Sequence, residues 1–378
     1  MADRTTAARN VRIWRWPGVA AALLAATGAA EGARAEPVFE AIALPHLAGV
    51  RHGLNADGTA LGYAPLPGGG GRGPALVYRD GRIRVLELLG PGATPAALND
   101  AADVAVDIQP GGPCRTEPAE IVCTRHATVW QAGRLRDLGT LGGPRSFART
   151  LDGAGTVAGW SDLDRPTGAA TGPAFIQRGF VHAGGRMVEL PTLGGLHSRA
   201  LAMNATGEIA GWAEDAEARH RAVVWRTGTV NDLGTLGGTE SEAQAIGVRG
   251  HVAGWSRDAA GRRRAFLWRN GRMVDLGTLG GAESEATVIG ASGNIVSGWG
   301  ENAAGERRAF FWWDGNMLDL TALVAPGFAT PDEPAIFSEV VAINDRMELV
   351  ATLSGGSASA KSRRFVRHVL LVRRGGAR

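Results

Sequence analysis

The chain has 378 residues, of which 40 are basic and 37 acidic, and it contains two cysteines. The first 35 residues hold five arginines and two acidic residues, so the rest of the chain carries 35 residues of each sign. A balanced charge lacks the electrostatic signature of proteins that bind nucleic acid or an anionic membrane surface. We therefore expect no nucleic-acid partner.

The N-terminal segment has the pattern of a secretory signal peptide. Arg9, Arg12 and Arg15 precede an apolar stretch over 17–30 that is too short to span a bilayer comfortably, and small residues lead to Ala35. A short buried helix is the alternative. We expect cleavage after Ala35, which gives a signal peptide over 1–35 and one mature domain over 36–378.

The mature chain has no second apolar run of membrane-spanning length. Together with the signal peptide, this predicts a location in the periplasm or outside the cell. We also expect the protein to be a monomer. Cys114 and Cys123 lie close together in PGGPCRTEPAEIVCTRH, and in an oxidising compartment a disulfide between them is favoured. A two-cysteine metal site is the alternative, but His126 is the only nearby imidazole and its spacing fits no common zinc pattern. We expect no metal and no cofactor.

Further along the chain, one motif returns at a nearly fixed distance. DLGTLGG, or a relaxed form of it, begins at five acidic residues with spacings of 52, 43, 43 and 44: Asp137, Glu189, Asp232, Asp275 and Asp319. A VAGW-like motif runs in phase and ends at Trp160, Trp212, Trp255 and Trp299. A period of about 43 residues indicates a repeat architecture.

The cleanest unit, 242–281, contains four short extended segments. They cover 242–248, 251–256, 264–269 and 272–276, and turn residues separate them. Asn270-Gly271 supplies the positive φ angles of a two-residue hairpin. No stretch of the mature chain shows a sustained helical period. Four antiparallel strands (a to d in chain order) in a unit of this length predict an all-β fold, a β-propeller.

Seven pairs of strands a and b can be traced, which predicts seven four-stranded blades, although six or eight stay open. The pairs begin at His52, Pro95, Phe147, Arg199, Glu242, Glu285 and Glu339. The segment 38–47 resembles a strand d and the segment 365–373 a strand c. We expect one blade to combine strands from both ends of the chain and so close the ring.

Units such as RRAFLWRNGRMVDLGTLGG resemble the bacterial extracellular repeat called HAF, named after a His-Ala-Phe triplet. The triplet here reads Arg264-Ala-Phe266, and Val341–Asp345 keeps an Ala-Ile-Asn-Asp turn. The resemblance is strongest from about His126 to Leu323. It implies an exported, propeller-like protein and carries no catalytic residues that could be transferred.

DLGTLGG could also be a glycine-rich phosphate loop, but such a loop needs a following helix and a Lys-Ser/Thr pair. Gly281 is followed by another extended segment without lysine. We interpret the motif as the connection between blades, with its first leucine in the core. We expect the carboxylates of Asp137, Asp232 and Asp275 to accept backbone N–H groups at the end of strand d.

The repeated tryptophans favour packing between blades, with sugar-stacking platforms as the alternative. No catalytic residue stands out, because the histidines show no ligand spacing and no GxSxG elbow is present. Asp162 and Asp164 could contribute to a calcium loop, but a solvated loop is favoured because the pattern is short.

The irregularities of the repeat point to one face. In a propeller the d–a and b–c connections share a face, and the b–c connections are expanded over 64–73, 108–125 and 161–179. On this face the residue before the repeated serine varies: Arg145, His197, Glu240 and Glu283. We expect these side chains to surround the channel mouth and bind a ligand, the alternative being ordinary solvated loops.

Together these patterns favour a non-enzymatic binding scaffold for a protein or glycan partner at that face. The alternative is a propeller-type carbohydrate-active enzyme, a polysaccharide lyase or hydrolase. Propeller enzymes assemble sites from distant blades, so the lack of a local motif does not exclude catalysis.

Overall fold

The structure, a computed structural model, describes residues 38–44, 53–65, 72–86, 93–111, 114–116, 121–167, 173–325, 335–355 and 365–373. The expected signal peptide with its cleavage site at Ala35, the start of the first strand pair at His52, and most of the insertion over 64–73 lie outside these ranges.

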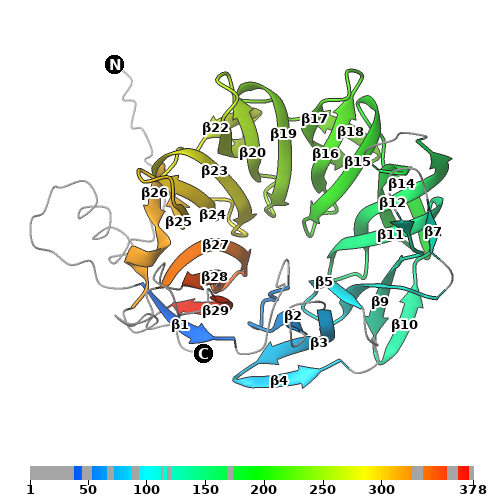
Figure 1. Cartoon of the computed structure of the whole chain (residues 1–378), viewed down its shortest axis with the longest axis horizontal. Helices are drawn as coiled ribbons and strands as arrows, with labels where there is room; N and C mark the ends of the chain where they lie inside the picture. The colour runs from blue at the N-terminus through cyan, green and yellow to red at the C-terminus, as the bar shows by residue number, and fades with distance from the viewer. Residues whose placement is uncertain are drawn as a thin grey trace, which may run out of the picture.

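Seven antiparallel sheets stand in a ring, and in blades 2 to 6 the first strand is the innermost one (Figure 1). This confirms the predicted all-β propeller. Blades 3 and 4 are β11 (Gly142–Leu151), β12 (Val157–Pro166), β13 (Phe175–Ala183), β14 (Arg186–Glu189), β15 (Gly194–Met203), β16 (Ile209–Asp215), β17 (His220–Arg226) and β18 (Thr229–Asp232).

Blades 5 and 6 have the same order of strands, and a short 3₁₀ helix follows blade 6. They are β19 (Gly237–Ile246), β20 (Val252–Asp258), β21 (Arg263–Arg269), β22 (Arg272–Asp275), β23 (Gly280–Ile289), β24 (Ile295–Asn302), β25 (Arg307–Trp313), β26 (Asn316–Asp319) and η2 (Leu320–Leu323).

Blades 1 and 2 are less regular. In blade 1, the inner strand is reduced to a bridge between Leu54 and Ala60 beside a three-stranded sheet. Blade 2 carries a two-stranded hairpin within its b–c connection. These elements are β2 (Ala60–Pro65), β3 (Arg72–Arg79), β4 (Arg82–Val85), β5 (Thr94–Leu98), β6 (Val104–Ile108), β7 (Arg115–Thr116), β8 (Ile121–Val122), β9 (His126–Gln131) and β10 (Arg134–Asp137).

Blade 7 joins the two ends of the chain, as predicted. Its order from the channel outward is β27 (Ala335–Ile343), β28 (Leu349–Gly355), β29 (Phe365–Arg373) and β1 (Phe39–Ala43). The amide of Val38 also donates to the carbonyl of Leu323 at 2.8 Å, which ties this strand to blade 6. The ring is therefore closed by hydrogen bonds rather than by side-chain packing alone.

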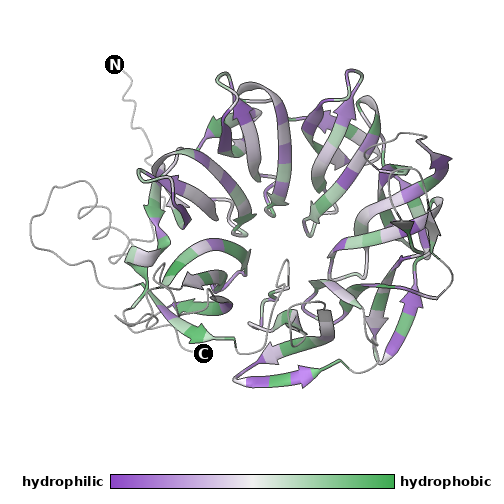
Figure 2. Ribbon diagram, viewed as in Figure 1, coloured by the Kyte–Doolittle hydropathy of each residue, from purple (hydrophilic) through white to green (hydrophobic). Residues whose placement is uncertain are grey.

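The core lies between neighbouring blades. One cluster joins Leu267 and Leu276 of blade 5 to Ala286, Val296 and Phe310 of blade 6. The outer strands β4 (RIRV) and β10 (RLRD) contain both hydrophilic and hydrophobic residues (Figure 2), and all four positions of each strand are exposed.

Each inner strand of blades 3 to 6 contains a β-bulge that explains the glycine of the VAGW motif. In blade 5 the register shifts between Ala243 and Ala245. A Cβ atom on Gly254 would lie 2.0 Å from the carbonyl oxygen of Glu242, and one on Gly159 would lie 1.9 Å from that of Phe147. Glycine is required because the backbones approach too closely for any side chain.

Asparagine side chains latch the a–b turns of neighbouring blades together. Asn344 donates to the carbonyl of Asn55 at 3.0 Å, Asn55 to that of Asn99 at 3.3 Å, and Asn99 to that of Asp152 at 3.0 Å. The asparagine of the Ala-Ile-Asn-Asp turn therefore joins blade 7 to blade 1. We call the face that carries the a–b and c–d turns the turn face, and the opposite one the hinge face.

The predicted strands of the 242–281 unit differ from the observed ones mainly at one end. Strand β19 begins at Gly237, five residues before the predicted start at Glu242. The reason is that the Gly-Gly pair is part of the inner strand, where Gly237 pairs with Asp258. The motif is thus a hinge that continues directly into the next blade.

Candidate functional site on the hinge face

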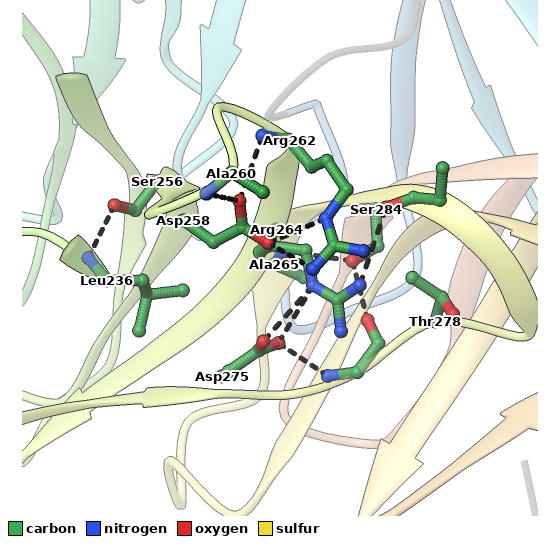
Figure 3. Close-up of polar contacts among 12 residues, drawn as sticks. Leu236, Ser256, Asp258, Ala260, Arg262, Arg264, Ala265, Asp275, Thr278 and Ser284 are labelled. Atoms are coloured by element: carbon green, nitrogen blue, oxygen red, sulfur yellow. Dashed lines mark hydrogen bonds and ion pairs between the residues drawn. The ribbon is translucent and has the colours of Figure 1, made fainter. Parts of the chain in front are cut away.

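The DLGTLGG hinge is held by its own polar side chains (Figure 3). The carboxylate of Asp275 accepts the amide of Gly277 at 2.8 Å, as predicted, and Thr278 donates its hydroxyl to Gly281 at 2.9 Å. Asp137 and Asp232 make the same contact with Gly139 and Gly234. The predicted burial of the hinge leucines is also confirmed, since Leu138, Leu233 and Leu276 are each 6% exposed.

The repeated serine after each Gly-Gly connects two blades. Ser284 accepts the amide of Ala265, in strand c of the preceding blade, at 2.9 Å and donates to the carbonyl of Gly277 at 2.6 Å. Ser146 and Ser241 make the equivalent pairs of contacts. All three serines are fully buried. The polar side chains of the motif therefore form hydrogen bonds with backbone groups of the scaffold.

The first position of the His-Ala-Phe triplet pairs with the hinge aspartate. His126 lies 2.7 Å from Asp137, and Arg264 lies 3.1 Å from Asp275. Arginine and histidine can both donate to the hinge carboxylate from this position. These pairs support the hinge and leave the residues between Gly-Gly and serine as the variable part of the face.

Two of the four predicted mouth residues form the same pair with opposite polarity. In blade 3, Arg145 bonds to Asp162 of strand b at 2.6 Å, with the aspartate side chain fully buried. In blade 5, Glu240 bonds to Arg257 of strand b at 2.8 Å, and both side chains are more than a third exposed. Asp162 therefore lies in a buried ion pair, and the prediction that it belongs to a solvated loop is wrong.

The other two mouth residues also contact strand b. Glu214 accepts the backbone amide of His197 at 2.9 Å, and Glu301 accepts that of Glu283 at 3.1 Å. Burial lowers the pKa of His197, whose Nδ1 accepts the amide of Gln177. All four predicted residues thus lie at one level of the ring. Each contacts the side chain that stands two residues after the repeated tryptophan in strand b.

Sequence reasoning missed those strand-b partners, although a signal existed. The partners all stand two residues after the repeated tryptophan: Asp162, Glu214, Arg257 and Glu301. In blades 3 and 5 the charge of the partner is opposite to that of the mouth residue. Arg145 and His197 are basic and Glu240 and Glu283 acidic, but the strand-b partners change the distribution of charge around the mouth. Arg145 and Glu240 are locally compensated, whereas blade 6 places two acids, Glu283 and Glu301, at this position.

The tryptophans lie at the interfaces between blades. Trp212, Trp255 and Trp299 are 6–8% exposed. The guanidinium of Arg263 lies 4.0 Å from the Trp255 ring centroid and bonds to Glu285 of the next blade at 2.6 Å. Between blades 6 and 7, Arg307 and Glu339 repeat this arrangement over Trp299. Cation–π contact and ion pairing thus join neighbouring blades near the channel.

The same level differs between blades 4 and 5. There, the ring of His220 stacks on Trp212 at 3.9 Å in place of an arginine. Burial and the nearby carboxylate of Glu285 raise the pKa of Glu242 to about 7, against the opposing charges of Arg263, Arg199 and Arg149. One half-buried carboxyl group of the channel wall therefore exchanges its proton near neutral pH.

The b–c insertion of blade 2 is a covalently closed hairpin. A disulfide joins Cys114 to Cys123, which confirms the predicted bond, and strands β7 and β8 pair between them. Val122 packs with Ala174 of the blade 3 b–c connection and with Phe175, the first residue of β13. The expanded connections of blades 2 and 3 therefore pack against each other on the hinge face.

Among the described residues, no group of three or more histidine, cysteine, aspartate or glutamate side chains is arranged to hold a metal ion. No helix in the described part of the chain is long and apolar enough to cross a bilayer.

Comparisons with known proteins identify no family for this chain. No protein-family profile matches the chain, and no curated protein matches it. Among solved structures, TolB from Acinetobacter baumannii is 15% identical with a TM-score of 0.38, over 68% of this chain and 62% of that one. A gluconolactonase from Xanthomonas campestris is 14% identical with a TM-score of 0.37, over 76% and 92%.

An acylaminoacyl peptidase from Pyrococcus horikoshii is 12% identical with a TM-score of 0.47, over 84% of this chain and 52% of the peptidase. The chain therefore spans less than two thirds of TolB and about half of the peptidase. At this distance none of the three assigns a substrate or a partner.

Proposed function

We propose that the protein is an exported scaffold of the HAF-repeat kind, which binds a protein or glycan partner on its hinge face. The supporting observation is the disulfide-closed hairpin of blade 2, packed against the expanded connection of blade 3. A disulfide limits the conformations of an exposed loop, and an ordered loop loses less entropy when it binds. Function tends to lie on loops that a rigid scaffold holds in place.

The rest of the ring supports this location for the partner site. Blades 4 to 6 connect strands b and c by short turns closed by their own side chains; Asp258 accepts the amides of Ala260 and Arg262 at 2.9 and 3.0 Å. Such turns present little adaptable surface. The partner would contact the blade 2 hairpin, the blade 3 connection and the channel mouth, where the carboxylate of Glu283 of blade 6 lies on the side opposite these loops.

Replacement of the blade 2 insertion tests the proposal. Residues 110–125 would be exchanged for the blade 5 turn, residues 258–263, and the variant and the wild type would be compared by crosslinking in the native host. The matched control exchanges the blade 6 turn, residues 302–307, for the same blade 5 sequence. Capture of one partner should be lost with the blade 2 exchange and kept with the control; capture that survives the exchange and Glu283→Lys would contradict the proposed face.

Export and cleavage form a separate part of the proposal. Mature protein recovered from the periplasm or medium should begin at Glu36 and contain no free thiol. Intact-mass measurement with and without reduction tests both points. Recovery of the full-length chain from the cytoplasm would overturn this part and leave the partner site untouched.

One observation favours the alternative, a propeller-type carbohydrate-active enzyme. Glu242, with its pKa raised to about 7, stands near a second carboxylate, Glu285, in the channel wall. A carboxyl group whose pKa is raised toward neutrality can stay protonated and act as a general acid. Incubation with acidic and neutral polysaccharides, with Glu242→Gln as control, distinguishes the two functions. Shortened products from the wild type alone would establish the enzyme.

A further inference from the structure

The turn face holds a cavity between blades 2 and 3 that the hinge-face proposal does not involve. Its volume is about 360 Å³, and its lining includes Gln131 and Arg136 of blade 2 with Thr156, His182 and the turn Gly184-Gly185 of blade 3. This volume lies in the lower part of the range of small-molecule sites, roughly 300–1,000 Å³. We call it the blade 2–3 cavity.

The cavity arises because blade 3 departs from the repeat at one position in strand c. His182 pairs with Val157 and Met187, which is the place that Trp225 and Trp268 occupy in blades 4 and 5. An imidazole is smaller than an indole, so the space that the tryptophan ring fills elsewhere is open here.

The interface between blades 4 and 5 shows the filled form of the same place. There Arg226 of blade 4 lies over the ring of Trp268, 5.8 Å from its centroid, and bonds to Glu208 of the a–b turn. Between blades 2 and 3 the corresponding residues are Gln131 and His182, and Gln131 bonds to Asp103 at 2.9 Å. Two smaller side chains thus replace an arginine and a tryptophan.

The wall of the cavity contains a polar atom that the protein leaves unsatisfied. His182 is 4% exposed, and its Nδ1 is buried without a hydrogen-bond partner. A buried polar atom of this kind destabilises the fold unless a partner satisfies it. Burial, and then the positive charge of Arg136, lower the pKa of His182, so the ring is neutral at pH 7 and offers one donor and one acceptor.

We propose that the blade 2–3 cavity binds a small hydroxylated carboxylate of the uronate class. The guanidinium of Arg136 supplies the planar fork that recognises a carboxylate. The neutral imidazole of His182 and the hydroxyl of Thr156 suit the alternating donors and acceptors of sugar hydroxyls. The site lies on the face opposite the partner surface proposed above and does not depend on it.

Titration calorimetry with glucuronate and galacturonate tests the site, with glucose as the uncharged control of similar size. The wild type should bind at least one uronate and bind glucose at least tenfold more weakly. Arg136→Gln should lower uronate affinity at least tenfold. Arg84→Gln, at the corresponding place in blade 1, should leave it unchanged. Absence of uronate binding, or equal affinity for glucose, would overturn the proposal.

A second variant tests the cavity itself. The double change Gln131→Arg with His182→Trp recreates the blade 4–5 packing and should abolish uronate binding while the melting temperature stays equal or rises. The imidazole resonance of His182, identified by its loss in His182→Trp, should move when uronate is added to the wild type. Binding that persists in the double variant, or an unmoved resonance, places the ligand elsewhere and refutes the site.

Discussion

Blades 3 and 5 share a backbone plan and use it differently. Both contain the bulged inner strand, the hinge serine and the close glycine contact, at Gly159 and Gly254. Blade 5 joins strands b and c by a short turn, fills its outer interface with Trp268 and exposes its mouth ion pair. Blade 3 has a longer b–c connection, replaces that tryptophan by His182 and buries its ion pair.

The comparison teaches that the repeat motif specifies hydrogen bonds of the scaffold, whereas binding surfaces arise where a blade departs from it. In both blades, the polar side chains of DLGTLGG and the hinge serine form hydrogen bonds with backbone groups. The glycine of VAGW allows two backbones to approach each other closely. The variable positions change in charge, size and burial. Substitutions at shared positions should therefore have equal effects in blades 3 and 5, and substitutions at divergent positions unequal ones.

The largest and most equal effect is expected at the close glycines. Gly159→Ala and Gly254→Ala each place a methyl group about 2 Å from a backbone carbonyl oxygen, and each should lower the free energy of unfolding by at least about 4 kcal/mol. Gly153→Ala, where a Cβ atom meets nothing within 4 Å, is the control and should change it by less than about 1 kcal/mol. Urea denaturation measures all three. Unequal losses at the two close glycines would show that the blades do not share the bulge.

The mouth ion pairs should separate the two blades. Arg145→Gln leaves the buried carboxylate of Asp162 without its guanidinium and should cost about 3 kcal/mol. Glu240→Gln breaks an exposed pair and should cost less than about 1 kcal/mol. The double change of Arg145→Gln with Asp162→Asn should restore most of the loss, since no charge then stays buried. Equal costs for the two single changes would remove the distinction between these blades.

The channel wall of blade 5 should make stability depend on pH. Because Glu242 has a pKa of about 7 in the folded protein against 4.5 unfolded, the unfolded chain binds fewer protons between these values. Stability should therefore fall as pH rises from about 5 to 8, by about 3 kcal/mol from this group. Glu242→Gln should match the wild type near pH 5 and exceed it at pH 8. Melting curves of the two proteins that stay parallel across this range would contradict the raised pKa.

The sequence predicted the architecture well because its signals are local. The turn Asn270-Gly271 and the returning DLGTLGG depend on residues adjacent in the chain, so the blades and the closure of blade 7 followed from them. Contacts across the inner pair of strands did not follow. The bulges shift the register between strands a and b, so counting residues does not place Arg145 opposite Asp162. The cavity at His182 was also not predicted. Histidine in place of tryptophan indicates a cavity only when the structure shows that the tryptophan of the other blades fills that space.

The smallest effect is expected at the first position of the His-Ala-Phe triplet, and it tests why that position varies. Arg264 contacts the hinge Asp275, whose side chain is 39% exposed, so Arg264→Ala should cost about 0.5–1 kcal/mol. Arg264→His should cost less, because His126 reaches the corresponding Asp137 at 2.7 Å from the same place in blade 2. Urea denaturation at pH 7 compares the two variants, with Arg272→Ala on the exposed outer strand as control. If histidine costs more than alanine, the aliphatic stem of the arginine is what the position needs. If it costs less, a donor to the hinge carboxylate suffices there, and the triplet belongs to the scaffold in every blade.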